Sequence, residues 1–434
     1  MSGGPPLLPG DCFAYGGERI GVRAALDLLR ERVAPVAGTE TVPLARAAGR
    51  VLAETVVSPR DVPGFDNAAV DGYAFAHDGA AAAAATRGVE QAVVRLELWP
   101  GRSAAGHPFR ATIPPRHALK VLTGAPMPPG TDTVALQEEA AVEGDRLLVP
   151  AGLKAGANRR RAGEDVSRGQ PVLEPGQRLG PQHLGVAAEL GFAELRVRRP
   201  LDVAIFSTGD ELVAPGRALP EGGVYDANRF ILMALLAGLP ARVRDLGILP
   251  DDPAAVRMAL QAAASAHHVV LTSGGASRGE EDHVVRGVAA LGRLDFWQIA
   301  MKPGRPLAFG SLGQAVFVGL PGNPVAAMVC FLLFARPVLL RLAGAAWPEP
   351  RRFPVPAGFS FRKKPGGRSE YLRARLDTRP DGGGAPRVLR IERDGSGILT
   401  SMTEADGLVE LDEAAGDVRE GDAVPFLSFA ELGL

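Results

Sequence analysis

The pattern of apolar residues changes near residue 200. From Pro200 onward, short continuous apolar runs alternate with segments of helical periodicity. The predicted strands are 201–206, 241–246, 268–272, 296–301 and 316–320. The predicted helices are 229–239, one that begins at Asp252-Pro253, and one from Asn323-Pro324 to about Leu342. This alternation predicts a doubly wound α/β domain, in which helices cover both faces of a mostly parallel sheet.

The first half of the chain has a different pattern. Residues 19–33 carry helical spacing, with Val22, Leu26 and Leu29 on one stripe, and 181–190 predict a second helix followed by a strand at 193–197. Between these helices lie short β patterns separated by Gly and Pro turns, at 93–98, 118–122, 133–137 and 146–149. The sequence therefore predicts a β-rich domain inserted into a helical one.

A third pattern follows a segment rich in proline and arginine after Gly344. Short strands are predicted at 371–376, 388–391, 407–411 and 423–427, which indicates a compact, barrel-like C-terminal β domain. The predicted domain limits are 1–50 with 159–198 for a helical linker domain, 51–158 for the insert, 199–345 for the α/β domain and 346–434 for the C-terminal β domain.

Composition narrows the classes of function. The chain has 434 residues, 46% of them hydrophobic and 22% charged, with a formal net charge of -1. This balance argues against nucleic acid or a membrane surface as a partner. Cys12 and Cys330 are the only cysteines, so a disulfide framework is excluded and a reducing cytoplasm is expected. The N-terminus lacks the pattern of a signal peptide, and the longest apolar run, 325–335, predicts a buried helix because it is too short to span a membrane.

Glycine-rich turns follow several of the predicted strands. They read FSTGDE (206–211), LTSGGASRGEED (271–282), KPGRP (302–306) and GLPGNP (319–324). Glycine lets backbone N–H groups converge on an anion, and carboxylates beside such loops suit a divalent cation. A phosphate-bearing ligand with a cation is therefore expected. The residues expected to contact this ligand are Ser207, Thr208, Gly209, Ser273, Gly274, Gly275, Lys302, Arg305, Pro321, Gly322, Asn323 and Pro324.

Each motif also has an ordinary structural explanation. Strand-to-loop turns account for FSTGDE, an N-cap accounts for Asn323-Pro324, and acids at a helix start complement its dipole. Lys302 and Arg305 could equally be solvated surface charges. The insert has comparable polar loops around Asp71, Thr123 and residues 159–165. The seven histidines show no spacing typical of metal ligands, and neither a P-loop nor a catalytic triad is recognisable.

Several motifs occur together in one order: FDNAAVDGYAF, LTGAPMPPGTDTVALQEE, GEDV, FSTGDEL, YDANR, LGILPDDP, SGGASRGEED, KPGRPLAFG and LPGNPVA. Over about residues 15–434 the chain thus resembles the molybdopterin molybdenumtransferases, the MoeA family, which includes the E domain of gephyrin-type proteins. The resemblance implies the last step of molybdenum cofactor synthesis, in which adenylylated molybdopterin and molybdate give molybdenum cofactor and AMP. It also implies a homodimer in which the α/β domain of one subunit and the insert of the other form the active site.

The resemblance also assigns functional residues. In the insert these are Asp71, Thr123, Arg160 and Asp165. In the α/β domain they are Glu211, Asp251, Asp282 and Lys302, with Pro321 and Pro324 shaping the last loop. Glu211, Asp251 and Asp282 are expected to hold Mg²⁺ or another divalent cation. Molybdate is expected to enter an adjacent basic pocket.

Two positions depart from the family pattern, and two other functions compete. Gln298 stands where the family often has a basic residue, and Ala162 interrupts an arginine run that some members continue. One rival is a molybdopterin adenylyltransferase that uses ATP, although that family consists of the α/β domain alone. The other is a non-catalytic gephyrin-like scaffold, which would not need the acids and glycine loops. Other proteins of molybdenum cofactor synthesis are candidate partners.

Overall fold

The computed structural model describes residues 14, 19–78, 93–274, 283–364, 367–378 and 385–434. Contacts divide the chain into two compact units. The first comprises Met1–Ala53, Pro175–Gly180 and Glu194–Leu434, and the second comprises Glu54–Glu174 and Pro181–Ala193. The domain limits predicted above remain a prediction.

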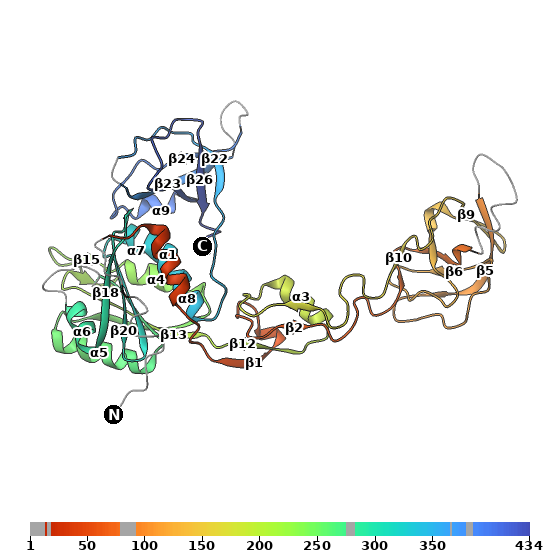
Figure 1. Cartoon of the computed structure of the whole chain (residues 1–434), viewed down its shortest axis with the longest axis horizontal. Coiled ribbons are helices and arrows are strands. Elements are labelled where there is room, and N and C mark those ends of the chain that lie inside the picture. Colours follow the sequence, from red (N-terminus) through yellow and green to blue (C-terminus); the bar gives the residue numbers. More distant parts are fainter. Residues whose placement is uncertain (1–13, 15–18, 79–92, 275–282, 365–366, 379–384) are drawn as a thin grey trace. The chain divides into compact units, whose positions relative to one another are not determined.

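The first unit contains the predicted α/β sheet (Figure 1). Its strand order is β16 (Ala241–Leu249), β13 (Leu201–Thr208), β17 (Val269–Ser273), β21 (Ala315–Leu320), β20 (Pro306–Leu312) and β18 (Gly292–Gln298). The first four strands are parallel to one another, whereas β20 and β18 run antiparallel at one side. The mostly parallel sheet is thus confirmed. Strand β20 was not predicted, because it begins with Pro306 and contains Gly310, and both residue types weaken a strand pattern.

Alternate residues of the central strands pack on opposite faces of this sheet. Val203 and Ile205 contact a core formed with α1 (Val22–Arg32), α4 (Asn228–Ala237) and the helix after residue 323. Ala204 and Phe206 contact α5 (Pro253–Ala266) and α6 (His283–Leu291) on the other face. Because both faces are buried, the strands read as continuous apolar runs.

The apolar helix after residue 323 lies in the core. It consists of α7 (Pro324–Cys330), a π-helical segment (Phe331–Ala335) and α8 (Arg336–Leu342). This 19-residue helix is long and apolar enough to span a membrane, but 83% of its most apolar window is buried inside the protein. The prediction of a buried helix is confirmed, but its premise was wrong: the helix continues through Arg336 and Pro337 and is not too short to span a membrane. The π-helical segment ends at Ala335, two residues before Pro337, whose ring would clash with a regular helical turn.

The C-terminal β domain is a six-stranded sheet within the first unit. Its order is β19 (Met301–Lys302), β23 (Ser369–Asp377), β25 (Gly407–Leu411), β26 (Ala423–Ser428) and β22 (Phe353–Pro356), with β24 (Arg387–Arg390) paired to β23. The short helix α9 spans Thr400–Thr403. Strand β19 belongs to the KPGRP loop and pairs parallel with β23, so this sheet is joined directly to the α/β loops.

The second unit is built on another six-stranded sheet. Its order is β7 (Thr133–Leu136), β4 (Gly72–Phe75), β6 (His117–Val121), β5 (Val93–Ser103), β9 (Arg146–Pro150) and β8 (Ala141–Glu143). Strand β4 was missed, since VDGY reads as a turn. Its first residue must be glycine, because a Cβ at Gly72 would lie 1.9 Å from the carbonyl oxygen of Ala135.

The remaining elements are short. Four pairs of strands connect parts of each unit: β1 (Thr39–Pro43) with β12 (Glu194–Arg198), β2 (Val56–Val57) with β11 (Pro171–Leu173), β3 (Asn67–Ala68) with β10 (Arg159–Arg160), and β14 (Leu212–Val213) with β15 (Val224–Tyr225). Helix α3 (Pro181–Glu189) and the 3₁₀ turns Leu44–Arg46 and Gln137–Glu139 complete the elements of the described residues. The predicted helix 181–190 and strand 193–197 are thereby confirmed.

The KPGRP loop packs tightly on α7. Gly304 has φ 89°, and a Cβ there would lie 2.5 Å from Sγ of the buried Cys330. Gly304→Ala should lower the free energy of unfolding by about 1–3 kcal/mol, because the added methyl overpacks this contact. Adding Cys330→Ala should restore most of the loss, as measured by thermal or denaturant unfolding.

Gly313→Ala is the matched control. Gly313 also has positive φ, 56°, but a Cβ there would meet no atom within 4 Å. Equal losses in Gly304→Ala and Gly313→Ala, with no recovery in the Cys330→Ala background, would show that the backbone conformation and not the contact decides the effect.

Candidate functional site

The carboxyl ends of the parallel strands lead to a cavity of about 520 Å³ in the first unit. Four groups of residues line it. Gly274 follows β17, Met301 and the KPGRP loop (302–306) form the second group, and residues 321–323 with Ala326 of α7 form the third. The fourth group, Arg368, Asp394 and Ser396, comes from the C-terminal domain. Ligands of doubly wound sheets commonly bind at this edge.

Backbone contacts hold the loops of the cavity in place. The N–H of Gly274, at φ 89°, donates to the carbonyl of Leu320, and the Asn228 side chain donates to the carbonyl of Gly322 at 2.6 Å. Asn323 occupies the N-cap position of α7, but its side chain makes no capping hydrogen bond. The N–H of Val325 donates instead to the carbonyl of Ser396 at 3.0 Å. The C-terminal domain therefore helps to fix the turn that lines the cavity.

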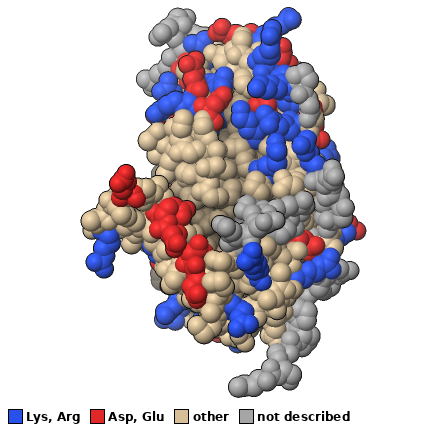
Figure 2. Space-filling model, turned by 90° about the vertical axis from the view of Figure 1, so that its left-hand side faces the viewer, with Lys and Arg blue, Asp and Glu red and all other residues tan. Residues whose placement is uncertain are grey.

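Positive charge dominates the lining. Lys302 and Arg305 are exposed, and Arg368 adds a third cation. The one carboxylate in the described lining, Asp394, is paired with Arg390 at 2.5 Å. On the side of the molecule shown in Figure 2, Lys and Arg side chains gather on the C-terminal domain. Such a field attracts anions.

The predicted ligand-contacting residues divide into three groups. Gly274, Lys302, Arg305, Pro321, Gly322 and Asn323 line the cavity, and Pro324 begins α7 directly beside it. Ser207, Thr208, Gly209 and Ser273 lie at the carboxyl ends of β13 and β17 but outside the lining. Gly275 lies outside the described residues, as does Asp282, which was predicted to bind the cation.

Two buried hydroxyl groups at the end of β13 have no partner among the described residues. These are Oγ of Ser207 and Oγ1 of Thr208. Since a buried polar group is costly to leave unpaired, this strand end suits a polar ligand. The carboxylate of Glu211 lies over Gly209, close enough that a Cβ there would be 2.5 Å from Oε2.

The predicted cation ligands are only partly placed. Glu211 and Asp251 follow the neighbouring strands β13 and β16, and Oδ1 of Asp251 lies 3.9 Å from Nε2 of His283. Within the described part of the chain, no three acidic, His or Cys side chains form a metal-binding group.

In the insert, the structure brings Asp71 and Thr123 together. Both the backbone N–H and the hydroxyl of Thr123 donate to Oδ1 of Asp71 at 2.7 Å. The side-chain hydrogen bond, followed by the backbone one, holds the pKa of Asp71 below its usual value. The two residues come from separate loops, before β4 and after β6.

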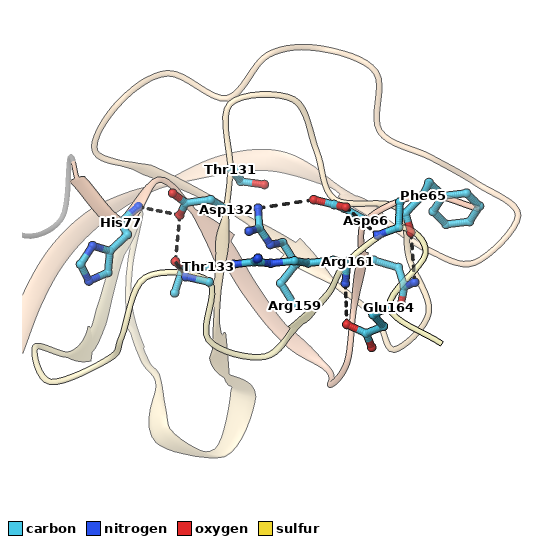
Figure 3. Close-up of polar contacts among 12 residues, drawn as sticks. Phe65, Asp66, His77, Thr131, Asp132, Thr133, Arg159, Arg161 and Glu164 are labelled. Atoms are coloured by element: carbon cyan, nitrogen blue, oxygen red, sulfur yellow. Dashed lines mark hydrogen bonds and ion pairs between the residues drawn. The ribbon is translucent and has the colours of Figure 1, made fainter. Parts of the chain in front are cut away.

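The arginine loop of the insert is ordered by acids. Arg159 forms an ion pair with Asp66 at 3.4 Å, and the N–H of Arg161 donates to Glu164 (Figure 3). The predicted residues Arg160 and Asp165 are exposed on the same loop. The Thr123 loop and the arginine loop both adjoin β3, because the N–H of Gly124 donates to the carbonyl of Ala68 at 2.8 Å and Ala68 lies opposite Arg159 in the β3–β10 pair.

Sequence reasoning missed the cavity residues of the C-terminal domain. Arg368, Asp394 and Ser396 lie in a region that was interpreted only as a β domain. The sequence gives little indication of them, because none belongs to a glycine-rich turn after a parallel strand. The GRSEY segment (367–371) is the one local indication, since it places charged side chains at the start of a buried strand.

Comparison with known proteins identifies the family. Residues 20–191 match the MoeA N-terminal region (domain I and II), residues 204–341 match a probable molybdopterin binding domain, and residues 354–429 match the MoeA C-terminal region (domain IV). The molybdopterin molybdenumtransferase of Haemophilus influenzae is 38% identical over 396 residues, which cover 91% of this chain and 95% of that protein. This chain belongs to the MoeA family.

Other members of the MoeA family agree with this result. Molybdopterin molybdenumtransferase 2 of Mycobacterium tuberculosis is 33% identical, over 88% of this chain and 93% of the relative. The crystal structure of the moeA protein from Pyrococcus horikoshii OT3 superimposes with a TM-score of 0.79 at 29% identity, covering 94% of this chain and 100% of the other. The multidomain α/β fold and the resemblance are therefore confirmed.

The Asp71–Thr123 pair yields a testable pKa. Thr123→Val removes the hydroxyl but keeps the backbone donor, so the pKa of Asp71 should rise partway toward its ordinary value. Carboxyl-detected NMR titration of wild type and variant measures this shift. Thr131→Val is the control, because its hydroxyl donates to Pro128 within a separate turn. An unchanged Asp71 pKa in Thr123→Val would show that the hydroxyl does not stabilise the carboxylate.

Proposed function

We propose that this protein inserts molybdenum into adenylylated molybdopterin and releases AMP. The observation that carries the proposal is the cationic cavity at the carboxyl edge of the sheet, in a chain that matches MoeA relatives over most of its length. Molybdate and the adenylylated pterin are both anionic. The two pterin sulfurs would displace oxygen from molybdate, which leaves as water, and a water is consumed when the phosphoanhydride is cleaved.

The lining residues suit an oxyanion. Lys302 and Arg305 supply charge from the KPGRP loop, and Arg368 supplies a planar guanidinium that can donate two parallel hydrogen bonds. The Ser396 segment and the Asn323 side chain add hydrogen-bonding groups at the same cavity. We assign molybdate to this cavity, and the phosphate-bearing part of the pterin to the adjoining loops after β13 and β17.

A divalent cation belongs to the proposal. The residues that would hold it are Glu211 and Asp251 with Asp282, and carboxylate oxygens are the ligands that Mg²⁺ prefers. Glu211 and Asp251 are both exposed after adjacent strands, which leaves their carboxylates accessible. When bound, such a cation neutralises charge on a pyrophosphate.

The deciding experiment measures AMP. Purified protein charged with adenylylated molybdopterin should release AMP only when molybdate is added, because the metal and the anhydride react together. Pyrophosphate formation from ATP and molybdopterin would identify the adenylyltransferase activity instead. If neither AMP nor pyrophosphate forms, the protein is a non-catalytic scaffold.

Lys302→Ala should raise the half-saturating molybdate concentration about tenfold or more, as expected for loss of a charge-assisted hydrogen bond of about 1.5–3 kcal/mol.

We further propose a cytoplasmic homodimer whose active site combines both subunits. The assigned residues fall in two separate compact units, with Asp71 in one and Lys302 in the other. Cys330 is a free thiol, which fits a reducing compartment. If the insert of one subunit completes the site of its partner, two inactive variants should complement each other when mixed.

The complementation test uses Asp71→Ala and Lys302→Ala, assayed at a molybdate concentration so far below the half-saturating value of Lys302→Ala that this variant alone releases almost no AMP. Random exchange between subunits should restore about a quarter of wild-type AMP release, because half of the dimers then carry one intact site out of two. Lys302→Ala mixed with Arg305→Ala is the control and should stay inactive, since both changes affect the same unit. Absence of complementation in exchanged dimers would show that each subunit builds its own site.

A further inference from the structure

Arg368 reaches the cavity from the C-terminal domain, and a buried acid lies next to it. Glu370 has a side chain only 3% exposed, and its Oε1 lies 3.7 Å from Nε of Arg368. Glu370 itself is not part of the lining. An ionised carboxylate in such a place needs a cationic partner, because removal from water is costly.

Strand pairing fixes the position of this acid. Strand β23 pairs with β19, so that Ser369 lies opposite Met301 and Glu370 lies opposite Lys302. The N–H of Ser369 donates to the carbonyl of Ala300 at 2.8 Å, which anchors the start of β23 on the KPGRP loop. Residues two apart in extended chain share a face, so Arg368 and Glu370 are directed to the same side.

We infer that Glu370 is a positioning residue that holds the Arg368 guanidinium toward the cavity. This inference rests on the proposed function. Arg368 follows Gly367 directly, and its side chain is only 29% exposed. A free arginine side chain loses rotamer entropy when it is ordered. The ion pair with Glu370 orders the side chain before molybdate binds, so the guanidinium is preorganised for the oxyanion.

The sign of the effect distinguishes positioning from simple charge. A nearby carboxylate repels molybdate, so charge alone predicts tighter binding when Glu370 is neutralised. Positioning predicts weaker binding, because the guanidinium loses its orientation. Glu370→Gln preserves size and removes the charge, and therefore separates the two effects.

The test is a double-variant cycle read by molybdate binding. Equilibrium dialysis of radioactive molybdate against the full-length protein requires no turnover. Glu370→Gln should weaken molybdate binding about tenfold in the wild-type background and have no further effect when Arg368 is Gln, since the two residues then act as one unit. When AMP release by Glu370→Gln is measured, the half-saturating molybdate concentration should rise by a larger factor than the factor by which kcat falls.

Glu410→Gln is the matched control. Glu410 is a second acid of this sheet, 13% exposed, whose carboxylate accepts from Tyr371 and pairs with Arg352 away from the cavity lining. It should alter thermal stability without altering molybdate binding. A defect of equal size in Glu410→Gln would reveal a general effect of disturbing this sheet and would overturn the inference.

The remaining outcomes are also decisive. Unchanged or tighter binding in Glu370→Gln, or a loss that persists with Arg368→Gln, excludes positioning through Arg368. If wild type binds molybdate and shows the coupling but releases no AMP, the proposed reaction fails while the positioning role stands. If wild type releases AMP but Arg368→Gln binds molybdate normally, the reaction stands and the positioning role fails.

Discussion

Parallel pairing of β13, β16, β17 and β21 is the constraint on which the rest of the structure depends. Parallel strands place all of their carboxyl ends at one edge of a sheet, so the turns that follow them must meet there. The strands can be parallel only because helices return the chain on both faces, and burial of both faces requires continuous apolar runs. The same constraint therefore explains the hydrophobic pattern and the location of the cavity.

The cavity also depends on contacts between distant parts of the first unit. Strand β19 adds the KPGRP loop to the sheet of the C-terminal domain, and the carbonyl of Ser396 accepts from the first turn of α7. These two connections bring Arg368 next to Lys302 and Arg305. Arg368, more than sixty residues downstream of the loop, thus lines the same cavity.

Charge is used differently in the two units. Around the cavity, basic side chains outnumber the described acids, and Asp394 is already neutralised by Arg390. In the insert, three acids order the loops that carry the predicted residues: Asp71 accepts from Thr123, while Asp66 and Glu164 contact the arginine loop. A cationic cavity and an accessible carboxylate are complementary parts of the chemistry that we propose.

The sequence by itself determined the α/β architecture, the buried helix after residue 323 and the glycine turns that line the cavity, because each depends on short-range periodicity or turn chemistry. It did not reveal strands β4 and β20, or the roles that we infer for Arg368 and Glu370 at the cavity. The first residue of β4 is glycine because the carbonyl oxygen of Ala135 approaches it too closely for a side chain. Arg368 lies near Lys302 because β19 pairs with β23. Contacts between residues so far apart in the chain leave no local pattern, so only the tertiary structure could decide them.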